Sequence, residues 1–214
     1  MSPPAATVSA HRSGGRGRAA VRRRRLTVMA IAGAAILVVA VAMLLPLARK
    51  AVNEIGLPLA YSDVIRQQAA DKHLDPALIA AVIYAETKFD PRPSSAGAEG
   101  LMQILPRTAE YLARRSGATT FTVTDLGTPT VNIAYGSYYL RYLLDHYGGQ
   151  EMLAVAAYNG GETNVDRWVA EARSAGGQLT VNEIPFSQTR AYVDKVLQAQ
   201  QDYRHTYPSQ LGYS

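Results

Sequence analysis

The stretch from Asp75 to Ala109 constrains the fold of this 214-residue chain more than any other. Asp75 is a good N-cap residue because its carboxylate can accept hydrogen bonds from the unpaired amides of a first helical turn, and Pro76 suits the first helical position. The next position on the apolar face of this helix is Glu86, so the sequence predicts a carboxylic acid where a leucine would be expected. The face itself has the i, i+1, i+4, i+5 spacing of a helix and consists of Leu78, Ile79, Val82 and Ile83.

A carboxyl group on an apolar face has a raised pKa, because removal from water disfavours its ionised form. Such a group holds a proton near neutral pH and can deliver it, as a general acid must. Glu86 is therefore a candidate catalytic acid. The alternative is that Glu86 lies in a frayed last turn as an ordinary surface acid. The loop that follows favours the first interpretation, since Pro93, Gly97 and Gly100 allow tight turns and a close approach of backbone to a ligand.

Four segments of the chain carry motifs in a fixed order. The first runs from Glu86 to Ala109 and contains Gly97-Ala98-Glu99-Gly100-Leu101-Met102-Gln103-Ile104. The others span residues 132–140, 156–161 and 184–193. Together they resemble the signature of the soluble lytic transglycosylase family over residues 59–207. This resemblance implies a mainly α-helical, lysozyme-like domain that cleaves the glycan strands of peptidoglycan.

The resemblance also implies roles for individual residues. Glu86 corresponds to the catalytic acid and Tyr192 to the tyrosine that orients it. Ser94 corresponds to a serine near the acid, although the loop is one residue shorter than expected, so Ser95 could take this part. Gln188 stands where the family often has Glu, and it keeps the hydrogen bonding of that side chain without its charge. The remaining candidates for substrate binding are Met102, Gln103, Tyr158 and Asn159.

Cleavage of a glycosidic bond usually requires two carboxyl groups, but one suffices when the 2-acetamido group of the substrate attacks the anomeric carbon. The resemblance implies this second route. Glu86 would protonate the oxygen between N-acetylmuramic acid and N-acetylglucosamine and then take the proton of the muramoyl 6-hydroxyl, which leaves a 1,6-anhydro end and uses no metal or cofactor. The alternatives are a goose-type muramidase that hydrolyses the bond, and a catalytically inactive peptidoglycan-binding module. The other acids near the motifs lie in polar loops: Asp90, Glu99, Asp125 and Glu183.

Charge divides the chain into two parts. The first 50 residues carry nine Lys and Arg and no acid, whereas the remainder carries 13 basic and 17 acidic residues. The basic character therefore belongs to the N-terminal part, which disfavours a nucleic-acid surface on the folded part. Cysteine is absent, which excludes a thiolate metal site. Metal binding is not expected either, because the histidines show no metal-ligand spacing: His11, His73, His146 and His205.

The N-terminal part contains a segment suited to a membrane. Residues 1–25 predict a disordered basic tail. Residues 26–47 are 22 residues without a charge, about 33 Å long as a helix against a hydrocarbon thickness of about 30 Å, so we expect a transmembrane helix. The arginines before it place the N-terminus in the cytoplasm and the catalytic domain on the cell-wall side. A cleaved signal peptide is the alternative. Residues 48–58 would be a linker and residues 208–214 a tail.

Apolar spacing and cap residues predict the helices of the domain. They span about residues 62–73, 76–88, 106–115, 131–147, 151–159 and 164–175, and a last helix begins at residue 187 or 188. Residues 118–130 read as a surface connection, and Trp168 as part of the core. The chain shows no alternating pattern long enough for a strand.

Overall fold

The structure is a computed structural model, and it describes residues 41–44, 56–91 and 94–213. The chain divides into two units, Met1–Val52 and Asn53–Ser214. In the first unit the described residues 41–44 are helical and exposed. The predicted tail 1–25, the rest of the predicted transmembrane segment 26–47 and most of the predicted linker 48–58 lie outside the described residues. Within the described ranges, no helix combines the length and the apolar character that crossing a membrane requires.

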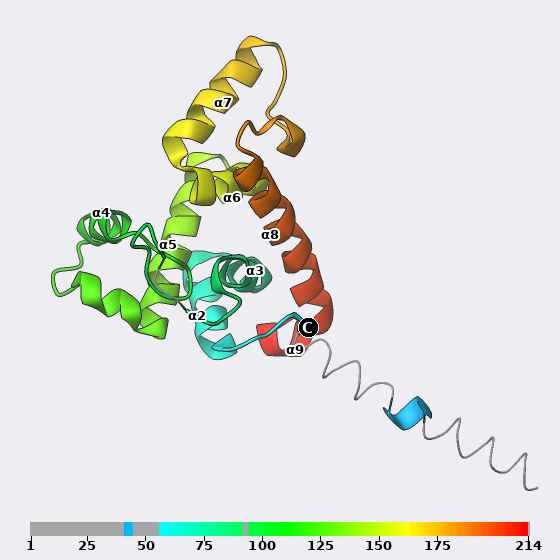
Figure 1. Cartoon of the computed structure of the whole chain (residues 1–214). Helices are drawn as coiled ribbons and strands as arrows, with labels where there is room; N and C mark the ends of the chain where they lie inside the picture. Colours follow the sequence, from blue (N-terminus) through cyan, green and yellow to red (C-terminus); the bar gives the residue numbers. More distant parts are fainter. Residues whose placement is uncertain (1–40, 45–55, 92–93, 214) are drawn as a thin grey trace, which may run out of the picture. The chain divides into compact units, whose positions relative to one another are not determined.

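The second unit is built from α-helices (Figure 1). Within the described residues, β-structure is limited to one antiparallel bridge between Glu99 and Ile104, so the prediction of a mainly α-helical domain is confirmed. Two short 3₁₀ helices, η1 (Val123–Gly127) and η2 (Val181–Glu183), interrupt the connections. The α-helices are α2 (Ser62–Lys72), α3 (Pro76–Thr87), α4 (Pro106–Ser116), α5 (Pro129–His146), α6 (Glu151–Gly160), α7 (Glu162–Ser174), α8 (Ser187–Thr206) and α9 (Pro208–Leu211).

Helix α3 begins and ends as its sequence predicts. The Asp75 carboxylate accepts a hydrogen bond from the backbone N–H of Ala77 at 2.9 Å, which confirms the predicted N-cap. The helix ends at Thr87, because Lys88 adopts the left-handed conformation with φ 52° and its N–H closes on the Tyr84 carbonyl at 3.1 Å. This termination leaves Glu86 in the last turn of α3.

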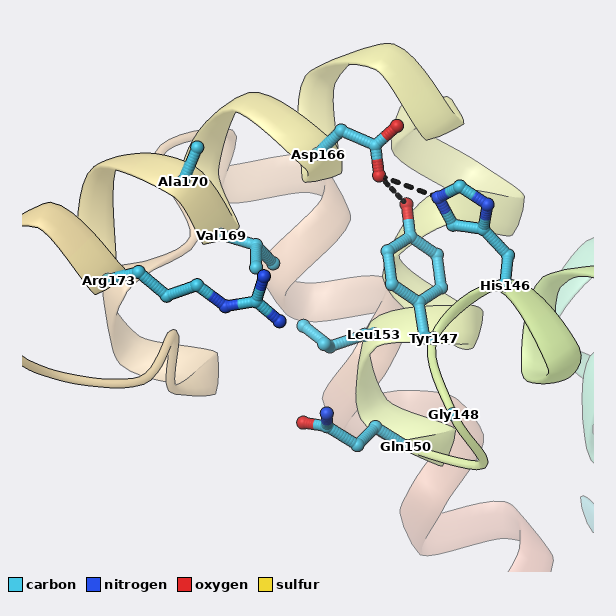
Figure 2. Close-up of a pocket in the computed structure, with 9 residues that line it drawn as sticks. All are labelled: His146, Tyr147, Gly148, Gln150, Leu153, Asp166, Val169, Ala170 and Arg173. Carbon is cyan, nitrogen blue, oxygen red and sulfur yellow. Dashed lines mark hydrogen bonds and ion pairs between the residues drawn. The ribbon is translucent and has the colours of Figure 1, made fainter.

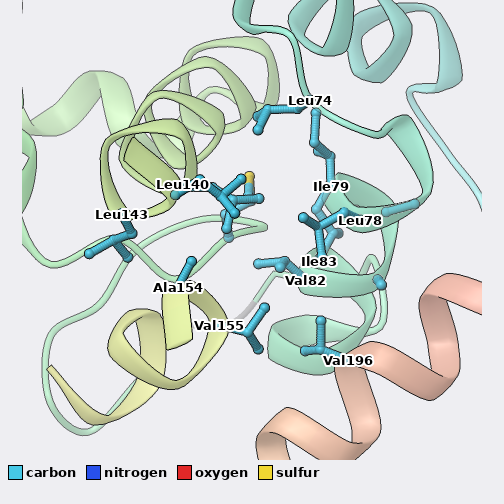
Figure 3. Packing of buried hydrophobic residues seen from close by; sticks show 14 of the residues in the cluster. Leu74, Leu78, Ile79, Val82, Ile83, Leu140, Leu143, Ala154, Val155 and Val196 are labelled. Carbon is cyan, nitrogen blue, oxygen red and sulfur yellow. The ribbon is translucent and has the colours of Figure 1, made fainter. Parts of the chain in front are cut away.

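Helix α3 lies at the centre of the hydrophobic core, next to α8 and α2. From Ala77 to Ile83 every residue is at most 1 % exposed, so the first two turns are buried on all sides and not only on the predicted face. Figure 3 shows residues of α5, α6 and α8 facing α3. Burial of each aliphatic side chain stabilises the fold by about 1.5–3 kcal/mol. The helix that carries Glu86 is therefore firmly held. The labelled neighbours are Leu140, Leu143, Ala154, Val155 and Val196.

The C-terminal residues correct one predicted boundary. Residues 208–214 were expected to form a tail, but Pro208–Leu211 is helix α9, which contacts α2 and α8. Leu211 is 2 % exposed, and the Tyr213 hydroxyl donates a hydrogen bond to the Asp75 carboxylate at the start of α3. The described part of this segment belongs to the domain because its apolar and phenolic side chains are buried there.

The domain also begins earlier than residue 59. The Tyr207 hydroxyl donates a hydrogen bond to the Leu57 carbonyl at 2.8 Å, and the Tyr203 hydroxyl donates to the carbonyl of Pro58. The end of the predicted linker is thus fixed to α8.

Two smaller predictions can also be compared with the structure. Trp168 is 3 % exposed, as expected of a core residue. The connection 118–130 contains η1, in which Leu126 is completely buried.

Candidate active site

Glu86 lines a pocket of about 580 Å³ at the C-terminal end of α3. Its side chain is half-buried, which does not fit the alternative of an ordinary surface acid. The pocket lies where the last turn of α3 meets the loop 94–104 and one side of α8. Its lining residues are Ala85, Glu86, Thr87, Lys88, Asp90, Ser94, Gln103 and Lys195.

Tyr192 of α8 contacts the acid directly. Its hydroxyl donates a hydrogen bond to Oε1 of Glu86 at 2.8 Å, and this bond joins residues 106 positions apart in the chain. Burial raises the pKa of the Glu86 carboxyl to about 7, while the bond from Tyr192 and then the positive charge of Lys195 oppose that rise. A carboxyl group with a pKa near neutrality suits a group that gives and then takes a proton.

A second phenol lies near the acid. Burial, followed by the charge of Glu86, raises the pKa of Tyr158 on α6 well above its ordinary value, and the same two causes act on Tyr192. Both phenols therefore remain protonated hydrogen-bond donors at neutral pH. The Tyr158 hydroxyl donates to the backbone carbonyl of Met102 at 2.9 Å, which links α6 to the loop beside the pocket.

The loop after α3 brings two predicted residues to the pocket. Ser94 lines it, and the Ser94 hydroxyl oxygen accepts a hydrogen bond from the backbone N–H of Ala98 at 2.8 Å. Ser95 is exposed and is not among the lining residues, so Ser94 rather than Ser95 lines the pocket that contains the acid. Gln103 also lines the pocket; its backbone has φ 49°, and its Nε2 donates to the Gly100 carbonyl at 2.9 Å.

Asn132 of α5 holds this loop, a role that the sequence did not reveal. Its side chain is completely buried. Its Oδ1 accepts a hydrogen bond from the Met102 N–H at 2.7 Å, and its Nδ2 donates to the carbonyls of Glu99 at 2.8 Å and Leu126 at 3.1 Å. A Cβ at Gly100 would lie 2.2 Å from this amide nitrogen, so glycine is required there. A polar residue on the buried face of α5 is the signal that could have revealed this role.

Met102 differs from its predicted position. It was expected to contact sugar, but its side chain is 0 % exposed and packs against α5. A Cβ at Gly136 would lie 2.3 Å from the Met102 Sδ, so the absence of a side chain at Gly136 makes room for the methionine. Met102 contributes to the hydrogen bonds beside the pocket through its backbone carbonyl, which accepts the bond from Tyr158.

Two further predicted residues are not brought to the Glu86 pocket. The Asn159 Oδ1 accepts a hydrogen bond from the Thr189 hydroxyl at 3.0 Å, and this bond ties the end of α6 to the start of α8. Gln188 is exposed and is not among the residues that line the pocket. Asn159 directly follows Tyr158 on α6, and Gln188 precedes Tyr192 by one turn on α8, so both residues lie near the junction of these helices but are not among the residues that line the pocket.

A second hollow of about 480 Å³ lies between the end of α5 and α7 (Figure 2). His146 Nε2 lies 2.9 Å from Oδ1 of Asp166, and the Tyr147 hydroxyl donates to the same oxygen at 3.0 Å. Together with Glu162, His146 and Asp166 form the group of potential metal ligands found among the described residues. Glu162 accepts a bond from Tyr142 at 3.0 Å. These bonds join α5 to α7, and the hollow shares no lining residue with the Glu86 pocket.

Fold and site together define the class of this protein: a lysozyme-like α-helical domain arranged around one half-buried acid. A family model described as the transglycosylase SLT domain matches residues 63–181, more than half of the chain. The chain therefore belongs to the transglycosylase SLT domain family.

Curated relatives carry related names. The soluble lytic murein transglycosylase of Salmonella typhimurium is 34% identical over 156 residues, which are 69% of this chain and 23% of that protein. The membrane-bound lytic murein transglycosylase C of Glaesserella parasuis is 32% identical over 167 residues, covering 68% of this chain and 46% of that protein. The chain thus spans about a quarter of the length of the first of these relatives and less than half of the second.

Solved structures agree with this assignment. The 70 kDa soluble lytic transglycosylase of Escherichia coli superposes with a TM-score of 0.67 and 30% identity, over 75% of this chain and 27% of that one. An inactive mutant of lytic transglycosylase Slt from Pseudomonas aeruginosa gives a TM-score of 0.66 and 30% identity, over 73% and 26% of the two chains. Over the part that superposes, the fold of this chain is therefore the fold of these two lytic transglycosylases.

Proposed function

We propose that this protein is a lytic transglycosylase that cleaves the β-1,4 bond between N-acetylmuramic acid and N-acetylglucosamine in peptidoglycan and leaves a 1,6-anhydromuramic acid end. The observation that carries the proposal is the Glu86 carboxyl group, whose pKa is raised to about 7 inside a pocket and whose Oε1 accepts a bond from Tyr192. The names of the related proteins support the same reaction.

In the first step, protonated Glu86 gives its proton to the glycosidic oxygen, which leaves as the 4-hydroxyl of N-acetylglucosamine. The bond between this oxygen and the anomeric carbon breaks, and the 2-acetamido oxygen of the muramoyl residue attacks that carbon. The hydrogen bond from Tyr192 stabilises the negative charge that develops on Glu86 as the proton leaves.

In the second step, the Glu86 carboxylate takes the proton of the muramoyl 6-hydroxyl. The 6-oxygen then bonds to the anomeric carbon and displaces the acetamido oxygen, which closes the 1,6-anhydro ring. Glu86 ends protonated, as it began, and no water is consumed. One acid serves both steps, so the second carboxylate of ordinary glycosidases is not required.

The substrate-binding residues fall into three groups in this proposal. Ser94, Gln103 and Tyr158 lie at or beside the pocket and would contact the sugars. Met102 and Asn159 would act indirectly, because the first is buried and the second bonds to α8. We retain Gln188 as a candidate for contact with the more distant part of the glycan, since its side chain is exposed.

Product analysis tests the proposed reaction. Purified full-length protein is incubated with peptidoglycan sacculi, and the released muropeptides are identified by liquid chromatography and mass spectrometry. We expect products about 18 Da lighter than their hydrolysed counterparts, because the bond is cleaved without the addition of a water molecule. Reducing muramic acid ends would indicate a muramidase instead. Equal inactivity of the wild type and of Glu86→Gln would indicate a peptidoglycan-binding module.

We also propose that residues 26–47 form a single membrane-spanning helix, with residues 1–25 in the cytoplasm and the catalytic domain on the cell-wall side. The uncharged length of this segment and the arginines before it support the proposal, as does the name of the membrane-bound relative. Protease treatment of spheroplasts provides the test. We expect the C-terminal domain to be degraded, and a domain that is protected until lysis would contradict this topology.

A further inference from the structure

Lys195 is a cation at the Glu86 pocket, and neither the motifs nor the proposed mechanism accounts for it. It lies on α8 one turn after Tyr192, so both side chains project from the same face of the helix. Its Nζ donates a hydrogen bond to the Ala85 carbonyl at 2.7 Å. The same ammonium group lies 5.4 Å from the centre of the Tyr84 ring, within the range of a cation–π interaction.

These contacts fix the ammonium group beside the acid. Ala85 directly precedes Glu86, and its carbonyl belongs to the C-terminal turn of α3, where the helix dipole attracts a cation. Lys195 and Glu86 line the same pocket. One N–H of the ammonium group is used by the Ala85 carbonyl, and none of the ion pairs found within the described ranges includes Lys195. Its charge is therefore not neutralised by a bonded carboxylate.

We propose that Lys195 is a positioning residue of this site: it anchors the last turn of α3 through the Ala85 carbonyl, and its positive charge stabilises the Glu86 carboxylate that remains after proton transfer. The catalytic part of this inference rests on the proposed function, since it concerns the same proton. Its electrostatic part concerns the protein alone and can be measured without substrate.

Other charged and titratable groups around Glu86 limit the size of the effect. Tyr192 comes from α8 and Tyr158 from α6, and both are neutral phenols at physiological pH. Lys88 and Asp90 follow α3 and line the same pocket, but both are exposed and carry opposite charges. Lys195 is itself exposed, so water and salt screen it, and we expect its removal to shift the titration of Glu86 by about 0.3–1 pH unit.

The electrostatic test follows the titration of Glu86 itself. The protein is labelled with ¹³C at glutamate side chains, and the Glu86 carboxyl signal is assigned by its absence in Glu86→Gln. In Lys195→Met, which keeps the length of the side chain, the Glu86 midpoint should rise. In Lys195→Arg, which keeps the charge, it should stay within about 0.2 unit of the wild type. Lys72→Met is the matched control, since Lys72 lies on α2 outside the pocket, and it should leave the midpoint unchanged.

Raising the salt concentration from 50 mM to 1 M should reduce the difference between the wild type and Lys195→Met, because salt screens an exposed charge. An unchanged midpoint in Lys195→Met, or an equal rise in Lys195→Arg, would overturn the inference. This result does not depend on activity. Absence of anhydro products from the wild type would refute the proposed function and the catalytic role of Lys195, while the titration would still decide the electrostatic role.

The rate of peptidoglycan cleavage tests the catalytic consequence. Below pH 6, where Glu86 is protonated in all variants, Lys195→Met should be about 3- to 10-fold slower, because the acid becomes weaker. The alkaline limb of its pH–rate profile should move to higher pH at the same time. Lys195→Arg should recover most of the rate. A slower rate with an unmoved alkaline limb would show that only the anchoring bond to Ala85 matters, and would overturn the charge role.

Discussion

Replacement of Tyr192 by phenylalanine removes a single hydroxyl group from the active site. In the wild type this hydroxyl donates to Oε1 of Glu86 at 2.8 Å. The ring of Tyr192 is 8 % exposed and packs in the core, so phenylalanine should keep the packing. The substitution therefore isolates the effect of one hydrogen bond on the acid.

The magnitude follows from the charge of the acceptor. A hydrogen bond to a charged group contributes about 1.5–3 kcal/mol, but the phenol also bonds to the protonated acid, so only the difference between the two states acts on the pKa. A difference of about 1.4 kcal/mol corresponds to one pKa unit. Because the bond favours the carboxylate, its loss should raise the pKa of Glu86 from about 7 to about 8. The rate below pH 6 should fall about tenfold, because the departing proton leaves a less stabilised anion.

The assay is the pH dependence of kcat/KM on sacculi between pH 4.5 and 9, which reports the ionisation of the free enzyme. Tyr207→Phe is the matched control. Tyr207 is a buried residue that follows the last turn of α8, far from the acid along the helix. Its hydroxyl donates a hydrogen bond to the Leu57 carbonyl, also at 2.8 Å. Tyr207→Phe should lower the free energy of unfolding by about 1 kcal/mol and leave the alkaline limb of the pH–rate profile unchanged.

The reasoning would be refuted if the alkaline limb of Tyr192→Phe stayed where it is in the wild type or moved to lower pH. A lower rate together with a lower melting temperature in Tyr192→Phe, and no displacement of the limb, would assign the hydroxyl to folding only. A displaced limb in Tyr207→Phe would show that the profile does not report Glu86.

Three further predictions concern the acid, its neighbour and its supporting loop. Glu86→Gln should reduce the rate of peptidoglycan cleavage by at least about 10³-fold. It should also be more stable than the wild type at pH 8, by about 2–3 kcal/mol, but equally stable at pH 4: the raised pKa, about 7 against an ordinary 4.5, means that the stability the carboxyl contributes at low pH is lost between pH 4.5 and 7. Denaturant titrations at both pH values check this, and equal differences at both would contradict it. Asp90→Asn should keep activity within about fivefold, because the 2-acetamido group of the substrate attacks the anomeric carbon in place of a second carboxylate. A loss as large as that of Glu86→Gln would favour a two-carboxylate hydrolase. Asn132→Ala should lower stability by about 3–5 kcal/mol, since three backbone groups lose their partner, two of them in buried hydrogen bonds and one in a partly buried bond. It should also raise KM through the loosened loop. Thermal denaturation and steady-state kinetics measure the two effects, and a stability loss under about 1 kcal/mol would show that water replaces the side chain.

Local sequence determined where the helices of the domain begin and end. The Asp75 cap, the proline at the start of α3 and the apolar spacing predicted α3 within one residue, because caps and periodicity act over a few neighbouring positions. Glu86 was identified for the same reason, as a charged residue that continues an apolar face. The motifs supplied Tyr192 and the loop, although no property of these residues by themselves placed them beside Glu86.

Tertiary structure alone decided what surrounds the acid. Residues 86 and 192 are 106 positions apart, and only the packing of α3 against α8 brings the phenol to the carboxylate. The same packing brings Lys195 to the Ala85 carbonyl. The fold also hid Met102 behind Gly136 and joined residues 208–213 to the domain. Such contacts depend on which buried surfaces match, a property of the whole core that no local pattern contains.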